Sequence, residues 1–289
     1  MSPHRPDISV VIPVRNGARS LPALLHSLAA QSLPAERFEV IVVDNGSADS
    51  TRQLAERAGA RVVSEPIPNR ARARNRGVQA ASAPRVAFTD ADCVATPGWL
   101  QAFLERGPDA PLVAGDVVVT TRPEQSALER FERLWRWGQS SWVLQGWAAT
   151  ANLAVTKAAF EAVGGFDPAY AHIGEDADFC IRAGRAGFGL AFCADAVITH
   201  DADRELGEFL RRAFRHGYSS AQAYHRLGVG HRAWRDPLPA ISGRRALAFH
   251  GQRPTGISIG EYRRMTVFAR LNYGARMAGS IWAELKRAR

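Results

Sequence analysis

The sequence is poor in cysteine. Its 289 residues include only three cysteines, Cys93, Cys180 and Cys193, which lack CxxC spacing. A disulfide framework needs paired cysteines, and a structural zinc cluster needs closely spaced ones. The sequence therefore excludes a small disulfide-stabilised fold, and it fits a reducing compartment such as the cytoplasm.

The sequence also lacks long apolar runs. It contains no stretch of about 18 consecutive apolar residues, so a membrane-spanning helix is not expected. Residues 1–7 lead directly into a strand-like segment and contain no signal-peptide core. We therefore expect a cytoplasmic protein. Since 46% of the residues are hydrophobic, the chain can still build a packed core.

Acidic residues are scarce towards the C-terminus. Residues 203–289 hold 17 of the 37 basic residues and six of the 28 acidic ones, a net charge of +11. Residues 1–202 have a net charge of −2, so the total of +9 comes from the C-terminal part. A basic chain suggests a nucleic-acid partner, but no recognition module is visible. We therefore expect a nearly neutral folded body, a basic extension and no nucleic-acid partner.

Strands and helices alternate along the first ninety residues. Runs of β-branched residues predict buried strands, and apolar residues at helical spacing predict the helices between them. The predicted strands are 8–14, 38–43, 61–63 and 86–89, and the predicted helices are 19–31, a segment from about residue 49, and 71–82. This order predicts an α/β fold with a mostly parallel central sheet flanked by helices.

Polar clusters follow three of the predicted strands. They are Arg15-Asn16-Gly17, Asp44-Asn45-Gly46-Ser47 and Asp90-Ala91-Asp92. Open α/β sheets bind ligands beyond the carboxyl ends of their strands, where these clusters would meet. Each cluster alone is also compatible with an ordinary turn. All three together indicate a binding site.

The pair Asp90 and Asp92 indicates a metal site. The two carboxylates follow an apolar strand, and the chain becomes apolar again at Cys93. Acidic residues in such surroundings are costly unless a cation or hydrogen bonds compensate them. Mg²⁺ and Mn²⁺ prefer carboxylate oxygens and often bridge them to substrate phosphates. The expected cofactor is therefore a divalent cation, Mn²⁺ or Mg²⁺.

A series of motifs resembles the family 2 glycosyltransferases of the GT-A fold. In chain order they are VVIPVRN from Val10, VVDNGSADST from Val42, ARNRG from Ala73, FTDADC from Phe88, ANLAV from Ala151, VGGFD from Val163 and GEDADF from Gly174. Their order and spacing match over about residues 7–200. The QxxRW motif of processive members is absent. The resemblance therefore implies an inverting, non-processive enzyme that transfers single sugars.

The resemblance also implies a donor and the residues that bind it. The donor is a nucleoside diphosphate sugar, with a UDP-sugar favoured, and the acceptor is an unknown hydroxyl, for which a lipid-linked molecule is one candidate. Residues implied to lie at the nucleotide, the diphosphate or the sugar are Pro13, Arg15, Asn16, Asp44, Glu65, Arg74, Asn75 and Asp90. Asn152 needs a polar partner among its apolar neighbours, and the candidates are the sugar and the loop of Asp90-Ala91-Asp92. Gly165 indicates backbone close to a ligand, although a helix C-cap would use the same residue.

The remaining roles concern the metal and the chemistry. The resemblance implies Asp92, Asp90 and His200 as the metal site, although a lone histidine is structural by default. It implies Asp176 as the general base, with Glu175 and Asp178 as alternates. Acids at the start of a helix are also ordinary caps.

The domain organisation follows from these positions. We expect a catalytic GT-A domain over residues 1–202, with a nucleotide-sugar half at about 1–95 and an acceptor half at about 96–202. Residues 203–289 form a basic helical extension with helices at 205–218 and 261–287 and an irregular segment at about 228–260. Basic amphipathic helices suit an anionic membrane surface, but they also pack on a domain or contact a protein.

The expected function is a metal-dependent inverting glycosyltransferase of the cytoplasm, and a peripheral position on the inner face of the cell membrane is one expected location. One alternative is a nucleotidyltransferase that makes a sugar nucleotide. That class needs a Gly-rich loop after the first strand, which the sequence from Pro13 to Gly17 does not supply. The other alternative is a non-catalytic membrane-binding or partner-binding protein of the same fold, which would not need the acidic clusters.

Overall fold

The chain divides into two compact units, which are described separately. The computed structural model describes residues 5–106, 110–121, 124–135, 138–170, 173–202, 205–226 and 259–287. The first unit contains Met1–Val118, Trp142–Ala171 and Glu175–His200, and the second contains Val119–Ser141, His172–Gly174 and Asp201–Arg289. The second unit thus includes residues 119–141 as well as the C-terminal segment, and the functional division at residue 202 stays a prediction.

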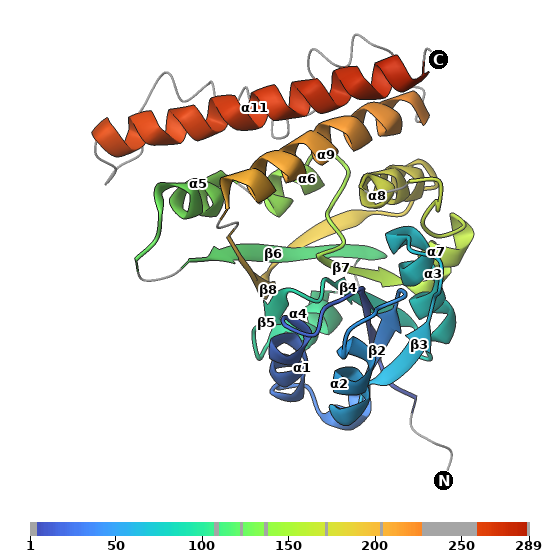
Figure 1. The fold of residues 1–289 in the computed structure, drawn as a ribbon. Coiled ribbons are helices and arrows are strands. Elements are labelled where there is room, and N and C mark those ends of the chain that lie inside the picture. Colours follow the sequence, from blue (N-terminus) through green and yellow to red (C-terminus); the bar gives the residue numbers. More distant parts are fainter. Residues whose placement is uncertain are drawn as a thin grey trace. The chain divides into compact units, whose positions relative to one another are not determined.

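The strands of the described residues form one sheet, in the order β3-β2-β1-β4-β7-β6-β8-β5 (Figure 1). The strands are β1 (Ile8–Val14), β2 (Phe38–Asp44), β3 (Arg61–Ser64), β4 (Arg85–Thr89), β5 (Cys93–Ala95), β6 (Leu112–Thr120), β7 (Asn152–Thr156) and β8 (Leu190–Asp201). β1 pairs in parallel with β2 and β4, and β2 pairs in parallel with β3. The four predicted strands and the predicted α/β fold are confirmed.

The later strands add antiparallel pairs to this parallel half. β7 runs antiparallel to β4 and to β6, and β5 runs antiparallel to β8. In these pairs Thr89 lies opposite Asn152, and Cys93 lies opposite His200. The pairing with β8 therefore fixes His200 beside the end of the Asp90-Ala91-Asp92 segment.

Helices connect and flank the strands. They are α1 (Leu21–Ala29), η1 (Ala35–Arg37), α2 (Thr51–Arg57), α3 (Arg70–Ala80), α4 (Trp99–Arg106), α5 (Ala127–Trp135), α6 (Gln139–Val143), α7 (Lys157–Ala162), α8 (Glu175–Arg185), α9 (Leu206–Arg226) and α11 (Ile259–Arg287). α3 packs closely on the sheet, because a Cβ atom at Gly77 would overlap the side chain of Val11 on β1. Only glycine allows this approach.

The second unit contains a small helical core. Leu128 and Phe131 of α5 pack with Phe209 of α9 and with Met265 and Ala269 of α11. The helices predicted at 205–218 and 261–287 are confirmed, and the first continues to Arg226. The irregular segment predicted at about 228–260 lies outside the described residues, apart from the start of α11.

Helices α9 and α11 lie along one another in backbone contact (Figure 1). A Cβ atom at Gly217 would overlap the carbonyl oxygen of Arg276, and one at Gly279 would overlap the carbonyl oxygen of Phe214. The Ser280 hydroxyl donates a hydrogen bond of 2.9 Å to the carbonyl of Gly217. Small residues at the crossing therefore set the distance between the two helices.

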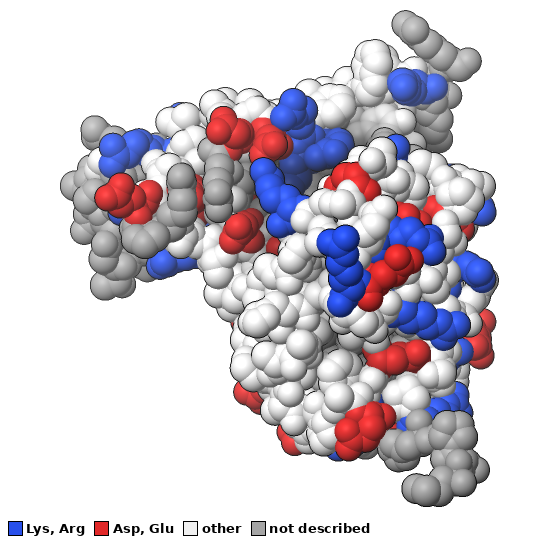
Figure 2. Space-filling model, turned by 60° about the horizontal axis from the view of Figure 1, so that its bottom comes forward, with Lys and Arg blue, Asp and Glu red and all other residues white. Residues whose placement is uncertain are grey.

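The hydropathy of the helices and the charges on the surface bear on what the protein can contact. No helix in the part of the chain that the structure describes combines enough length with enough hydropathy to cross a bilayer. On the face drawn in Figure 2, Lys and Arg side chains are interspersed with Asp and Glu side chains.

The helix crossing makes a testable prediction. Gly279→Val should lower the free energy of unfolding by about 1–3 kcal/mol, because the new side chain cannot fit against the backbone of α9. Gly274→Ala on the same helix is the matched control, since nothing lies within 4 Å of its added Cβ atom. That change should be neutral or stabilising by up to about 1 kcal/mol. Urea unfolding followed by circular dichroism measures both, and equal effects would contradict the packing described.

Candidate functional site

The loop after β1 is tied to the loop after β2. Asn16 has a positive φ of 54°, and its backbone N–H donates to the Ser47 hydroxyl at 2.9 Å. Its side-chain oxygen accepts the backbone N–H of Ala48 at 2.8 Å. Asn16 therefore shapes the loop. The neighbouring Arg15 is exposed and Pro13 is half-buried.

Two buried carboxylates follow β2 and β3. Asp44 accepts the backbone N–H of Ser47 at 3.0 Å, and the backbone N–H of Glu65 donates to the Asp44 carbonyl at 2.9 Å. Glu65 accepts the backbone N–H of Ile67 at 3.0 Å and faces Arg72 at 3.4 Å. The structure thus brings these two predicted residues together at the carboxyl ends of adjacent strands.

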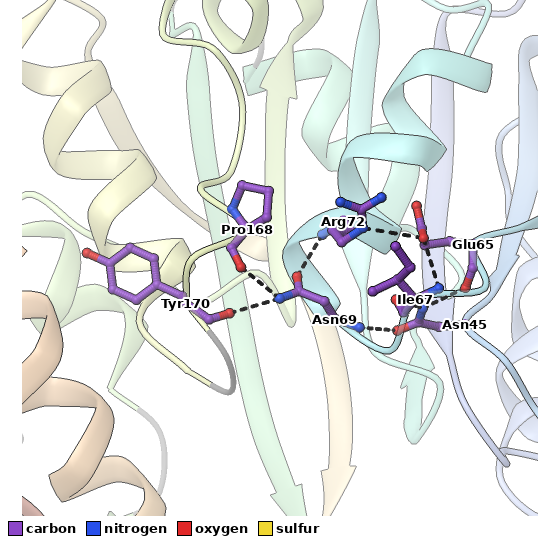
Figure 3. Close-up of polar contacts among 7 residues, drawn as sticks. All are labelled: Asn45, Glu65, Ile67, Asn69, Arg72, Pro168 and Tyr170. Atoms are coloured by element: carbon purple, nitrogen blue, oxygen red, sulfur yellow. Dashed lines mark hydrogen bonds and ion pairs between the residues drawn. The ribbon is translucent and has the colours of Figure 1, made fainter. Parts of the chain in front are cut away.

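Two asparagines join this loop to a distant one (Figure 3). Asn45 donates to the carbonyls of Glu65 and Ile67 at 2.8 and 2.7 Å, and it accepts the backbone N–H of Asn69 at 2.9 Å. Asn69 accepts the backbone N–H of Arg72, which caps α3, and it donates to the carbonyls of Pro168 and Tyr170.

Sequence reasoning missed Asn69. Its position directly before the helical run that begins at Arg70 is the signature of an N-cap, and this was the available signal. The sequence carries no sign of its second role, because residues 168–170 lie about a hundred positions further along the chain.

A buried guanidinium lies at the centre of the site. Arg74 is 2% exposed, and its Nη atoms contact Glu175 Oε1 at 2.5 Å and Asp90 Oδ1 at 3.0 Å. Burial opposes its charge, but the carboxylates of Asp90, Glu175 and Asp176 outweigh burial and raise the pKa of Arg74. Arg74 therefore holds the end of β4 and the start of α8 in one arrangement.

The second carboxylate of the motif faces a histidine. Asp92 Oδ2 lies 3.3 Å from His200 Nε2, and His200 is buried whereas the Asp92 side chain is 56% exposed. Among the described residues, no group of three or more His, Cys, Asp and Glu side chains surrounds a common point as a complete metal site would. Asp92 and His200 nevertheless offer a carboxylate and an imidazole on one side of a partly open position, which fits a cation whose other ligands come from a substrate.

Three acids begin α8, and the structure separates them. Glu175 is buried against Arg74, and Asp178 is paired with Arg182 at 2.7 Å. Asp176 is half-buried, and it accepts the backbone N–H of Ala177 at 2.9 Å. Burial, with the nearby charge of Glu175, raises the pKa of Asp176 to about 7. Asp176 is thus the member of the cluster best suited to exchange a proton near neutral pH.

Asn75 and Gly165 shape one loop. The side chain of Asn75 donates to the carbonyl of Phe166 at 2.8 Å and accepts its backbone N–H at 3.0 Å. Gly165 has a φ of 70°, and a Cβ atom there would meet the Phe160 ring. Its N–H also donates to the Phe160 carbonyl at 2.9 Å, which ends α7. Gly165 therefore closes the turn that caps α7 after its C-cap residue Val163, and it also belongs to the loop that Asn75 fixes.

Asn152 has protein partners where a sugar contact was expected. It is fully buried on β7, its side-chain oxygen accepts Trp99 Nε1 at 2.7 Å, and its nitrogen donates to the carbonyls of Asp116 and Ala196 at 2.7 and 2.8 Å. Both donors and the acceptor of the amide are used inside the protein. This geometry gives Asn152 a structural role.

Comparison with known proteins gives a consistent result. The sequence model described as glycosyl transferase family 2 matches residues 9–155, and that described as glycosyl transferase family group 2 matches residues 86–250. The chain is 32% identical over 228 residues to glycosyltransferase AglE of Haloferax volcanii, covering 76% of this chain and 74% of that protein. It is 33% identical over 261 residues to the pre-mycofactocin glycosyltransferase of Mycobacterium tuberculosis, covering 86% of this chain and 53% of that protein.

Solved structures share the fold. Mannosyltransferase PcManGT from Pyrobaculum calidifontis, in complex with GDP-Man and Mn²⁺, has a TM-score of 0.66 at 18% identity, covering 98% of this chain and 88% of that one. Glucosyl-3-phosphoglycerate synthase from Mycobacterium tuberculosis, in complex with Mn²⁺, UDP-Glc and phosphoglyceric acid, has a TM-score of 0.55 at 23% identity, covering 78% of this chain and 81% of that one.

The buried ion pair makes a prediction about stability. Arg74→Met should lower the free energy of unfolding by about 3–5 kcal/mol, because it leaves Glu175 buried without its partner. Arg72→Met is the matched control on the same helix, where the ion pair with Glu65 is 40% exposed on the arginine side. It should cost less than about 1 kcal/mol. Urea unfolding of both variants checks this, and a small loss in Arg74→Met would contradict the central role of Arg74.

Proposed function

The chain belongs to glycosyl transferase family 2, and from this premise we propose that it is a metal-dependent, inverting glycosyltransferase. It moves one sugar from a nucleoside diphosphate sugar to an acceptor hydroxyl at the cytoplasmic face of the membrane. Membership of this family also favours sugar transfer over the nucleotidyltransferase and non-catalytic alternatives.

The observation that supports this proposal is that each carboxylate of the Asp90-Ala91-Asp92 motif has a specific partner. Asp90 is held by the buried Arg74, and Asp92 faces His200 across the β5–β8 pair. One carboxylate is thus fixed beside a permanent cation, and the other points to a second metal-ligating side chain. This arrangement supports a site for a diphosphate and a divalent cation.

A divalent cation, Mn²⁺ or Mg²⁺, would be held by Asp92 and His200, with Asp90 beside them. Such a cation, when bound, neutralises charge that develops on the diphosphate leaving group. Arg74 holds Asp90 beside this cation and balances its negative charge. Two structural neighbours were solved with Mn²⁺, which supports this cofactor.

The donor would lie across the carboxyl ends of β1, β2 and β4. Asp44 and Glu65 would contact the base or ribose, with Pro13, Arg15 and Asn16 beside them. Asn75 and Gly165 act by holding the loop near Phe166. We favour a UDP-sugar, and the neighbours solved with GDP-Man and with UDP-Glc make both nucleotides worth testing.

Asp176 would act as the general base. The acceptor oxygen attacks the anomeric carbon as the bond from that carbon to the diphosphate oxygen breaks. The hydroxyl proton passes to the Asp176 carboxylate, and the bonding electrons leave with the nucleoside diphosphate. In-line attack of this kind inverts the anomeric configuration. Glu175 is committed to Arg74 and would serve as a positioning residue.

The place of action is proposed from the C-terminal part of the chain. Residues 203–289 have an excess of basic side chains, which favours the anionic inner leaflet of a cell membrane. An enzyme docked there would reach a lipid-linked acceptor.

Asp176 makes a prediction about pH. A base must be ionised, so kcat/KM should rise with pH up to a plateau, with an apparent pKa near 7. Asp176→Asn should lower kcat by about 100-fold to 10,000-fold, while donor binding stays within about twofold. Glu175→Gln is the control. Without the charge of Glu175 the pKa of Asp176 should fall, so kcat/KM should still rise with pH but should do so at lower pH. Full turnover in Asp176→Asn would remove this residue from the mechanism.

Metal removal tests the other half of the site. Nucleoside diphosphate release should be measured with UDP-sugars and GDP-sugars, first with Mn²⁺ and then with EDTA. Chelation should abolish release, and added Mn²⁺ should restore it. Asp92→Asn should lower release by at least about 100-fold, because it removes a ligand of the cation. Nucleoside diphosphate release that is unchanged by EDTA would overturn metal dependence. If no donor is bound and none releases its nucleoside diphosphate, the assignment of the chain as an enzyme for these substrates would be overturned.

A further inference from the structure

Helix α11 has an apolar face that the protein leaves in solvent. Five large exposed apolar residues form this face, Val267, Leu271, Ile281, Trp282 and Leu285, with exposed fractions between 38% and 54%. Tyr273 and Met277 of the same helix are also exposed and lie to one side of it. A turn of about 100° per residue places these side chains on one side of the helix. The face extends over about 27 Å from residue 267 to residue 285.

The opposite side of α11 is the one that folds the second unit. Met265, Ala269, Ser280 and Ala283 are buried, and Gly279 is in backbone contact with α9. Packing therefore accounts for one set of the apolar residues of this helix and leaves the other set unexplained. A contiguous exposed apolar strip on a folded chain usually marks an interaction surface.

Positive charge borders the apolar face. Arg264, Arg270 and Lys286 are exposed, and helical spacing places Arg264 and Arg270 on opposite sides of it. The ammonium group of Lys286 lies 5.8 Å from the centre of the Trp282 ring. Over its whole length the helix has six basic residues and two acidic ones, Glu261 and Glu284.

We propose that this face, defined by Val267, Leu271, Ile281, Trp282 and Leu285, inserts into the interface of an anionic lipid bilayer with α11 parallel to the membrane plane. Aliphatic side chains would enter the acyl boundary, Trp282 would lie at the headgroup level, and the flanking cations would contact lipid phosphates. The inference rests on the proposed membrane location and assigns it to particular residues.

Charge favours a bilayer over a second copy of the chain. A symmetric dimer through this face would bring two strongly basic helices together, which is unfavourable. An anionic lipid surface complements the same charges. Insertion across the bilayer is excluded for α11, because it is not apolar enough to span one.

The test uses the full chain and vesicles of phosphatidylglycerol and phosphatidylcholine. Ile281→Gln with Leu285→Gln should weaken co-sedimentation by at least about tenfold, since both apolar side chains leave the interface. The matched control is Ile67→Gln with Leu144→Gln, which removes two exposed apolar residues of the first unit and should leave binding unchanged. Val267→Gln with Leu271→Gln is a second pair on the same face, for use if the first does not fold.

A second pair of variants tests the contribution of positive charge to vesicle binding. Arg264→Gln with Arg270→Gln should weaken binding by about fivefold per arginine, and vesicles of phosphatidylcholine alone should bind poorly. Full binding by the folded face variants would overturn the inference, and so would a dimer, seen by sedimentation, that these variants dissociate. Metal-dependent nucleoside diphosphate release should stay normal in the face variants. Normal release without vesicle binding by the unmodified chain would refute this inference and leave the proposed function standing.

Discussion

The pairing of Arg74 with Asp90 and Glu175 is the interaction on which the site depends. A guanidinium buried to 98% is tolerated only with compensating charge and hydrogen bonds, and the two carboxylates come from segments far apart in the sequence. Arg74 therefore orders the end of β4 and the start of α8 together. The same contacts commit Glu175 to Arg74. Burial and the charge of Glu175 raise the pKa of Asp176 to about 7, although the charge of Arg74 acts in the opposite direction. One buried cation therefore fixes the positions of Asp90 and Glu175 and balances their charge.

Much of the fold could be predicted because its signals are local. The strands 8–14, 38–43, 61–63 and 86–89 are runs of apolar residues, and the structure contains each of them within a residue or two. The acids after β4 and at the start of α8 also stand out in the sequence. The residue pattern alone does not indicate which groups pair across the sheet, and only the family resemblance placed Asp92 and His200 in one site. The 3.3 Å contact between Asp92 and His200 depends on the register of β5 with β8, which joins residues over a hundred positions apart.

The side chains of two asparagines show more clearly that the sequence does not indicate hydrogen-bond partners. The sequence around Asn152 indicates correctly that its amide needs a partner, but it does not say which one. The structure supplies Trp99, Asp116 and Ala196, all inside the protein. Asn69 is the reverse case, since its capping position is visible locally while its bonds to Pro168 and Tyr170 are not. A polar residue in an apolar run therefore predicts a hydrogen-bonded group, and only the fold decides whether the group serves structure or substrate.

The basic C-terminal segment illustrates how a composition becomes a surface. In the sequence, Met265 and Val267 are both apolar residues of one basic helix, and nothing distinguishes them. In the structure Met265 is buried in a core with Phe131 and Phe209, whereas Val267 is 53% exposed. The helix thus has one face that it needs for folding and another that folding does not use. The second face is the one that we propose for an anionic bilayer, a partner that is apolar inside and negatively charged at its surface.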